Sequence, residues 1–360
     1  MNSPVDLCKI PAAPPPNGYS SNFNNPTSLG PALVCITTFA TIWAIVFTLV
    51  RLYINLRKLG WADCFNLIAL LHSVAILGIE IAHFRFARHI WDVPACFFDV
   101  AYTQETYVLA VLLQTGAFFA KTSIFLLYLW LFKVQRPMRI AVYAGIVFSF
   151  CLYGAGTAVA TYYEIPRAGE KWTDTLDGRT EITLPWWQAQ SGLSVVLDLY
   201  IFILPLPVIA KLRLPVQKRI QLVAVFSLAV CGIAASIASL IERINIAHAY
   251  DQTWISAILS LCSAIELNVA IILSSAPAFA GFARNYLLDL PVAKLILSGN
   301  CFRRSKLRDS EAPLEGLEGR YENYHAERQG ISRDGVVLGR DHRYYELDDV
   351  STLNNGSNSY

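Results

Sequence analysis

The chain has 360 residues, of which 54% are hydrophobic and 16% charged, with a mean hydropathy of +0.42 and a formal net charge of +2. This composition is too apolar for a water-soluble domain, and nucleic acid is excluded as a partner because the basic residues lie in short segments between long apolar runs. The length allows one helical bundle and a tail, without a second large soluble domain.

The N-terminal residues 1–29 are polar and rich in proline, asparagine and serine. No basic segment followed by an apolar stretch occurs among them, so they lack the pattern of a cleaved signal peptide. We expect a short, flexible extracellular arm.

Seven apolar stretches follow, each close to the ~20 residues needed to cross a ~30 Å hydrocarbon core. Six connectors separate them, and none is long enough to fold as a domain. The sequence therefore predicts an all-α, polytopic membrane protein with the lipid bilayer as a partner, a seven-transmembrane helix bundle over residues 30–280. The expected spans are about 30–52, 64–83, 105–132, 140–163, 187–210, 220–241 and 254–279.

The basic residues predict the orientation of the bundle, because cytoplasmic segments of membrane proteins are enriched in Lys and Arg. The fifth connector holds four of them, whereas the sixth holds only Arg243; the fourth weakens the contrast, since it has as many as the third. We expect an N-out, C-in protein, placed in the plasma membrane. The basic residues that flank the first connector are Arg51, Arg57 and Lys58, and those of the fifth are Lys211, Arg213, Lys218 and Arg219.

Two further segments follow the last span. Residues 281–308 combine apolar positions with a basic cluster, which is typical of a juxtamembrane, interfacial segment. Cys301 lies beside these basic residues and is a candidate lipidation (palmitoylation) site. Residues 309–360 are charged and poor in aliphatic side chains, so we expect a disordered cytoplasmic tail, open to a cytoplasmic signalling partner.

The eight cysteines contain no CxxC pair and no spacing typical of a metal site. In the expected topology only Cys8 and Cys96 face the outside, where thiols are oxidised. They are a candidate disulfide between the arm and the start of the third span, and two free thiols are the alternative. The cysteines within the spans are expected to be packing residues.

Three spans carry one ionisable residue near the middle: Lys121 in the third, Asp198 in the fifth and Glu266 in the seventh. A charge at bilayer depth costs at least ~2.5–3.5 kcal/mol, so each of them should face the bundle interior and have a partner. Gln114 lies on the same helical stripe as Lys121, seven residues earlier, and Asn268 lies two residues after Glu266. We group these five residues as an expected interior polar cluster.

Two interpretations of this cluster stay open. It is either a small-molecule pocket or switch, in which Lys121 changes its partner between two states, or a buried ion-pair network that only fixes helix packing. The segment Leu204-Pro205-Leu206-Pro207 is likewise either a pivot within the fifth helix or its fraying end.

No catalytic signature accompanies the cluster: the sequence has no Walker loop, no G-x-S-x-G, no HExxH and no Rossmann glycine pattern. An enzymatic role is therefore disfavoured, although it stays open. The last span contains no lysine, so it cannot hold retinal through a Schiff base as opsins do, and no cofactor is expected.

Several short motifs occur in a characteristic order across about residues 35–280. They are Arg57-Lys58-Leu59-Gly60-Trp61-Ala62-Asp63, His89-Ile90-Trp91-Asp92-Val93, Lys121-Thr122-Ser123-Ile124, Asp198 with Leu204-Pro205-Leu206-Pro207, Glu242-Arg243, and Glu266-Leu267-Asn268. In this order they resemble the fungal rhodopsin-like integral membrane proteins of filamentous ascomycetes. The resemblance implies a receptor-like sensor for an unknown small-molecule or surface ligand.

The same family includes members encoded in secondary-metabolite clusters. The alternative function is therefore a membrane-bound accessory protein or enzyme of a fungal, mycotoxin-type biosynthetic cluster. Some members carry a Cys-rich extracellular module, but this N-terminus has a single cysteine, so such a module is not implied. A transporter is disfavoured, because seven spans do not divide into repeats.

Overall fold

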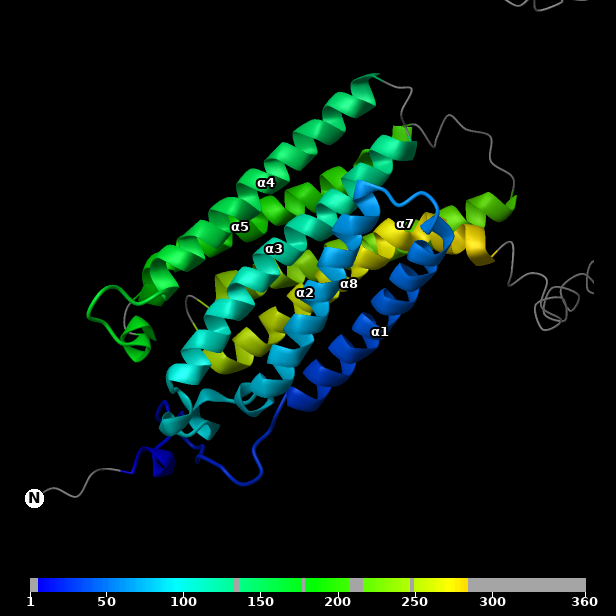
Figure 1. Cartoon of the computed structure of the whole chain (residues 1–360). Helices are drawn as coiled ribbons and strands as arrows, with labels where there is room; N and C mark the ends of the chain where they lie inside the picture. The colour runs from blue at the N-terminus through cyan, green and yellow to red at the C-terminus, as the bar shows by residue number, and fades with distance from the viewer. Residues whose placement is uncertain (1–5, 132–135, 177–178, 208–215, 247–248, 284–360) are drawn as a thin grey trace, which may run out of the picture. The chain divides into compact units, whose positions relative to one another are not determined.

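The computed structural model describes residues 6–131, 136–176, 179–207, 216–246 and 249–283. Seven long helices lie in this part of the chain (Figure 1), which confirms the expected all-α fold. They are α1 (Gly30–Asn55), α2 (Trp61–Ala82), α3 (Val100–Leu131), α4 (Arg136–Glu164), α5 (Arg179–Ile203), α7 (Val216–Asn245) and α8 (Gln252–Phe282). Short 3-10 turns lie in the segments between them.

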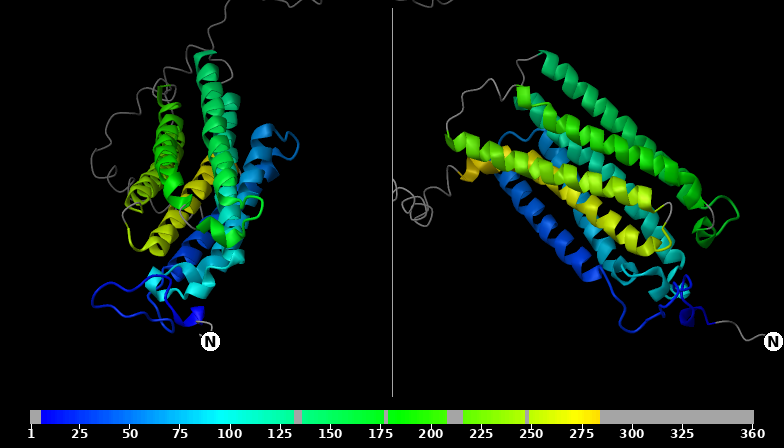
Figure 2. Two further views of the ribbon diagram at one scale, coloured as in Figure 1. Left: turned by 90° about the vertical axis from the view of Figure 1, so that its left-hand side faces the viewer. Right: turned by 180° about the vertical axis from the view of Figure 1, so that it is seen from behind.

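These helices lie side by side in one bundle (Figures 1 and 2). Each packs against the next along the chain, and α8 closes the ring by packing against α1. α8 also contacts α2 and α3. α3 and α8 therefore each pack against at least three other helices, and their inward-facing residues lie in the interior of the bundle.

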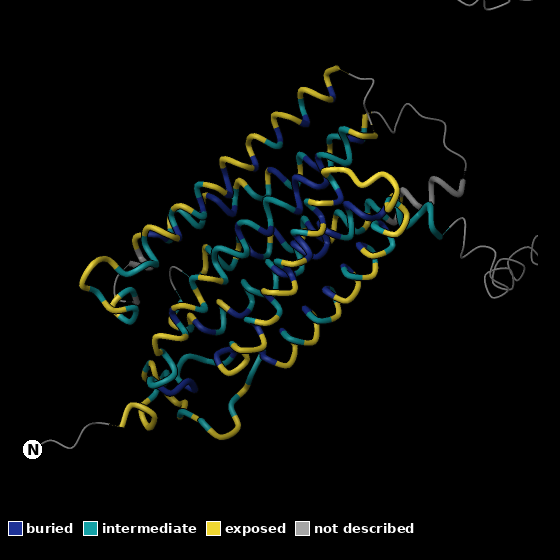
Figure 3. Tube along the Cα trace, in the orientation of Figure 1, coloured by how far each residue is buried: buried dark blue, intermediate teal, exposed yellow. Residues whose placement is uncertain are grey.

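The surface of the bundle is apolar and its interior contains many polar groups, which is the pattern of a membrane protein. Phe39, Ile140 and Phe150 are 64%, 71% and 63% exposed, whereas Asn66 and Ser275 are fully buried. Figure 3 shows how exposed and buried positions alternate along the helices. Six of the described helices are long and apolar enough to cross a membrane, so this is a multi-pass membrane protein.

α5 is the long described helix that does not reach this apolarity. Its sequence includes Gln190, Ser191 and Ser194, which lie in the interior rather than on the lipid-facing surface. α5 packs between α4 and α7, so it completes the seven-helix ring with a polar inner face.

The end of α5 differs from the expected span 187–210, because the helix ends at Ile203. Pro205 has no backbone N–H, so it cannot donate to the carbonyl of Ile201 four residues earlier. The hydroxyl of Tyr128 on α3 donates to that carbonyl instead, at 3.2 Å. The break in α5 is therefore coupled to α3 by a side chain, and residues 208–210 of the expected span lie outside the described residues.

One end of the bundle, here called the N-terminal end, is covered by residues 6–29 and 83–99 (Figure 1). The composition predicts a flexible arm for residues 1–29. In the structure, residues 6–29 lie against residues 83–99. The amide of Ala12 donates to Val93 O at 2.9 Å and that of Leu29 to Ala87 O at 2.8 Å. These backbone hydrogen bonds, together with a disulfide between Cys8 and Cys96, hold the arm against the segment 83–99, although its polar side chains bury little apolar surface.

The covering segment also contacts the start of α8. The ring of His89 stacks between those of Trp91 and Trp254, with centroid distances of 4.7 and 4.3 Å. Its Nδ1 lies 2.5 Å from Asp251 Oδ2, and the amide of Ile90 donates to the same carboxylate at 3.0 Å. The segment 83–99 thus joins the arm to α8.

In the structure, Cys8 and Cys96 form a disulfide across a separation of 88 residues. We expect the Cys8→Ser, Cys96→Ser double variant to lose ~2–4 kcal/mol of stability, because the cross-link restricts a long loop in the unfolded chain. Thermal unfolding of the purified protein measures this, with Cys35→Ser as the matched control because Cys35 is a free, exposed cysteine. Labelling of Cys96 by a thiol reagent in folded, unreduced protein would contradict the cross-link.

Candidate functional site

Lys121 on α3 lies in the interior with its side chain only 2% exposed. Its Nζ is 2.7 Å from Asp198 Oδ1 on α5 and 2.8 Å from Glu266 Oε1 on α8. It also donates to Ser194 Oγ at 2.9 Å. All three N–H groups of the ammonium thus have an acceptor. The structure brings together the three interior charges that the sequence places on separate helices.

Two further helices support this cluster. Ser236 of α7 donates to Asp198 Oδ2 at 2.5 Å, and the hydroxyl of Tyr153 of α4 lies 2.9 Å from Ser194 Oγ. The ring centroid of Tyr153 is 5.5 Å from Lys121 Nζ, within range of a cation–π interaction. α3, α4, α5, α7 and α8 all meet at this point.

The formal charges of the cluster do not balance, since one ammonium faces two carboxylates. Among the described residues, Arg243 of α7 is a further cation that interacts with the charge of Glu266. Its guanidinium lies 5.9 Å from the ring centroid of Trp187, and among the described residues no carboxylate is within ion-pair distance of it. The Lys121 cluster by itself therefore carries a formal charge of −1 when all three groups are ionised.

Two cavities meet at the cluster from opposite sides. A cavity of about 480 Å³ extends from it toward the end of the bundle opposite the N-terminal end, and a smaller one of about 70 Å³ extends toward the N-terminal end. Lys121 and Glu266 line both. The larger cavity is almost wholly apolar; its walls include Tyr128, Phe202, Phe226, Val269 and Leu273, and Asp198 completes its charged end.

Gln114 lies in the smaller cavity, near Lys121. It accepts a hydrogen bond from Gln190 Nε2 at 2.5 Å. Gly156 of α4 leaves room for this pair, because a Cβ there would lie 2.6 Å from Gln190 Nε2 and 3.0 Å from Gln114 Oε1. Gln114 is therefore a neighbour of the Lys121 cluster across a polar cavity, as expected from its position on the stripe.

Asn268 does not join the cluster, contrary to expectation. Its Oδ1 accepts from Ser73 Oγ of α2 at 2.8 Å, and its Nδ2 donates to Ala264 O at 2.9 Å. Two residues along an α-helix correspond to a rotation of roughly 200°. Asn268 therefore points toward α2, whereas Glu266 points toward α3 and α5. Cys301, most of residues 281–308 and the tail 309–360 lie outside the described residues.

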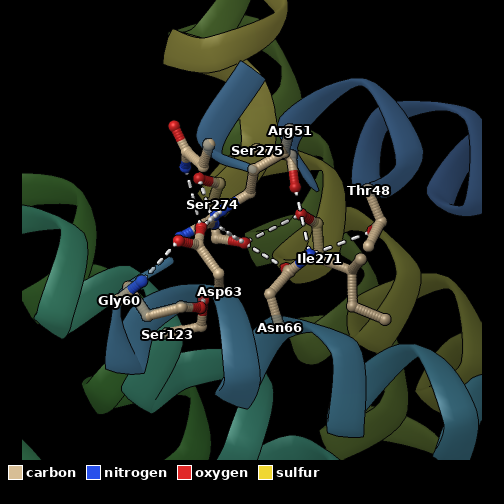
Figure 4. Close-up of polar contacts among 11 residues, drawn as sticks. Thr48, Arg51, Gly60, Asp63, Asn66, Ser123, Ile271, Ser274 and Ser275 are labelled. Atoms are coloured by element: carbon tan, nitrogen blue, oxygen red, sulfur yellow. Dashed lines mark hydrogen bonds and ion pairs between the residues drawn. The ribbon is translucent and has the colours of Figure 1, made fainter. Parts of the chain in front are cut away.

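The structure also contains a second buried ion pair that sequence analysis missed (Figure 4). Arg51 Nε of α1 lies 2.6 Å from Asp63 Oδ1 of α2, and both side chains are at most 5% exposed. Arg51 Nη1 also donates to Ser274 O of α8 at 2.7 Å. Arg51 is thus an interior residue, and it does not contribute to the positive charge of the first connector as expected.

Hydrogen bonds extend this pair into a network between α1, α2 and α8. Asn66 Nδ2 donates to Thr48 Oγ1 at 2.9 Å and to Ser275 Oγ at 3.2 Å, and Ser274 Oγ donates to Asn66 Oδ1 at 2.5 Å. Asp63 also accepts from the amide of Gly60 at 2.9 Å, which satisfies a free N–H at the start of α2. The network borders neither cavity, and its contacts are those of a helix-packing element.

Glu80 of α2 is a further buried carboxylate that was not expected. It is 1% exposed and accepts from Ser260 Oγ at 2.8 Å. The hydroxyl of Thr37 on α1 interacts with the same carboxylate. Glu80 is an ionisable residue within the expected second span 64–83, which is the signal that could have found it. It lies close to the end of that span.

Comparisons with known proteins agree on the type of protein. The model of the fungal rhodopsin domain matches residues 35–285. A SAT4 family membrane protein of Emericella nidulans is 27% identical over 242 residues, which cover 65% of this chain. The matched region spans only 59% of that relative. No solved structure matches the chain.

Proposed function

This chain belongs to the fungal rhodopsin domain family, and we propose that it is a sensor of the plasma membrane that binds a small molecule inside its bundle. The observation that carries the proposal is the cavity of about 480 Å³ that ends at the Lys121 cluster. Sites for small molecules are typically ~300–1,000 Å³, mostly apolar, with a few polar groups that orient the ligand. The larger cavity has these properties.

The cluster gives such a ligand a way to change the bundle. Lys121 pairs with carboxylates on α5 and α8, and Asp198 is in turn bonded to Ser236 of α7. A ligand that competes for one carboxylate shifts the balance between these contacts, and can shift the equilibrium only by its differential affinity for the two arrangements. The break after Ile203 gives the end of α5 a point at which it can bend, and the hydroxyl of Tyr128 couples this point to α3.

The proposed sensor is oriented N-out and C-in. Reporter fusions after Gly178, in the fourth connector, and after Gly339, in the C-terminal segment, are expected to lie on opposite sides of the membrane. The reason is the concentration of Lys and Arg in the fifth connector and after the last span. Protease protection of the two reporters in sealed vesicles measures this. Both reporters on one side would contradict the seven-span topology, and a reporter after Gly178 on the cytoplasmic side would contradict the N-out orientation.

Binding to the larger cavity can be tested with a library of small apolar molecules and thermal unfolding of the protein in nanodiscs. Ala229 lines the cavity, so Ala229→Trp fills part of it. Ala234 lies on the same helix and is exposed, so Ala234→Trp is the matched control. A ligand of the proposed site stabilises the wild type and the control and has no effect on Ala229→Trp.

The fate of such a ligand separates a sensor from the other classes. A sensor returns the compound chemically unchanged, and does not move it across the membrane of reconstituted liposomes. Spin labels at Ile203 and Val223, both exposed on α5 and α7, are expected to change their distance when the ligand binds. Turnover of the compound, transport, or binding without any change in this distance would each overturn the sensor function.

A further inference from the structure

We propose that the larger cavity selects a lipophilic amine, a molecule with an apolar body and one protonated amino group that binds to Asp198 and Glu266. This inference rests on the proposed function, because it names the ligand class of the same cavity. It is carried by three features of the cavity: the saturation of Lys121, the accessible carboxylates, and the distribution of positive charge.

Lys121 is not available to bind an acidic ligand. Its ammonium has three N–H groups, and Asp198, Glu266 and Ser194 accept one each at 2.7, 2.8 and 2.9 Å. A ligand carboxylate must displace one of these acceptors from Lys121, whose side chain is only 2% exposed. The displaced protein carboxylate then loses its partner, which is costly in the interior of a protein.

The two carboxylates have spare capacity. A carboxylate accepts about four hydrogen bonds. Asp198 accepts from Lys121 and Ser236, and Glu266 accepts from Lys121 and Ser194, with Ser236 as a further donor. Both Asp198 and Glu266 line the larger cavity. An N–H donor that enters from this side can reach them without breaking a contact of Lys121.

The distribution of charge favours a cation over a neutral donor. The cluster carries a formal charge of −1, and the only described cation near it besides Lys121 is Arg243, which lines the smaller cavity on the opposite side. Among the described residues that line the larger cavity, Lys121 is the one basic side chain. Arg243 acts on Glu266 from the smaller cavity, so a protonated amine adds its positive charge on the other side of the cluster. There it makes charge-assisted hydrogen bonds with the carboxylates, while its body packs against apolar walls that include Phe202 and Phe226.

The test uses matched probes that share a body and differ in one end group. Adamantyl, naphthylethyl and decyl compounds are each used as the amine, the alcohol and the carboxylic acid. Binding to the full chain in zwitterionic nanodiscs is measured by calorimetry, with empty nanodiscs subtracted. The amines are expected to bind at least about tenfold more tightly than the alcohols, a ratio that corresponds to ~1.4 kcal/mol, and the acids most weakly.

Variants of the cluster show whether its charge is the cause. Asp198→Asn balances the cluster, because Lys121 keeps Glu266 as its ion-pair partner. This variant should fold normally, bind the alcohols within about twofold of the wild type, and lose the preference for amines. Glu266→Gln should behave in the same way, because it leaves the pair of Lys121 and Asp198.

The outcomes distinguish this inference from the proposed function. If alcohols or acids bind as tightly as amines, or if both variants keep the amine preference, the inference is overturned. In that case loss of probe binding in Ala229→Trp, with retention in Ala234→Trp, still supports the binding site. If no probe binds in a manner that depends on Ala229, the inference and the proposed small-molecule site both fail.

Discussion

Replacement of Lys121 by methionine is expected to lower the free energy of unfolding by ~3–5 kcal/mol, because it leaves buried carboxylates without their cation. The Nζ of Lys121 is the one described group that contacts both Asp198 and Glu266 as an ion-pair partner. Thermal unfolding and folded yield in detergent measure the effect. Lys58→Met is the matched control, because Lys58 is exposed between α1 and α2 and its loss should change little.

The double variant Lys121→Met, Asp198→Asn separates the two interpretations of the cluster. It removes one charge of each sign and leaves Glu266 as the one ionisable group of the cluster, which becomes neutral when it takes up a proton. Much of the folded yield is expected to return. A network that only fixes packing then leaves binding to the larger cavity intact, whereas a ligand site loses it. Unchanged stability of Lys121→Met would show that Lys121 is not paired in the interior.

The sequence was sufficient to predict the bundle and the central ion pairs. Long apolar runs are readable without an alignment, because the bilayer fixes the length of a span. Lys121, Asp198 and Glu266 each stood alone near the middle of such a run, and a lone charge at that depth requires a partner. Helical periodicity led to Gln114, because a separation of seven residues returns to nearly the same side of a helix; in the structure Gln114 binds Gln190 and shares the smaller cavity with Lys121.

The predictions were wrong where the position of a residue depends on the rotation of a helix about its axis or on where a helix begins and ends. Asn268 was grouped with Glu266 because they are neighbours in sequence, but the helix turns it toward Ser73. Arg51 and Asp63 lie at the boundaries of the expected spans 30–52 and 64–83, so Arg51 was assigned to a connector. α1 continues to Asn55 and α2 begins at Trp61, so both residues are inside helices that face each other.

The apolar cavity could not be foreseen from the sequence. Its walls consist of ordinary core residue types such as Ile, Leu, Val and Phe, which pack together in most bundles. Whether they leave a space depends on the relative positions of four helices.

Replacement of either Arg51 or Asp63 is expected to destabilise the protein as much as replacement of Lys121. Arg51→Met leaves Asp63 buried with Asn55 and Gly60 as its remaining donors, and Asp63→Asn leaves Arg51 buried with Ser274 as an acceptor. Each change removes one member of a buried pair, so each is expected to cost ~3–5 kcal/mol. Arg57→Met is the matched control, because Arg57 is exposed in the same connector region. Thermal unfolding of the three variants in nanodiscs measures these losses.

A double-mutant cycle shows whether the loss comes from the pair itself. In the Arg51→Met, Asp63→Asn variant no unpaired charge remains, so its loss should be smaller than the sum of the two single losses by more than ~1 kcal/mol. Neither residue borders the larger cavity, so probe binding by the folded double variant should match that of the wild type. Additive losses would show that the two side chains act independently. Weaker binding would show that packing of α1, α2 and α8 is coupled to the Lys121 cluster through α8, which contributes both Ser274 and Glu266.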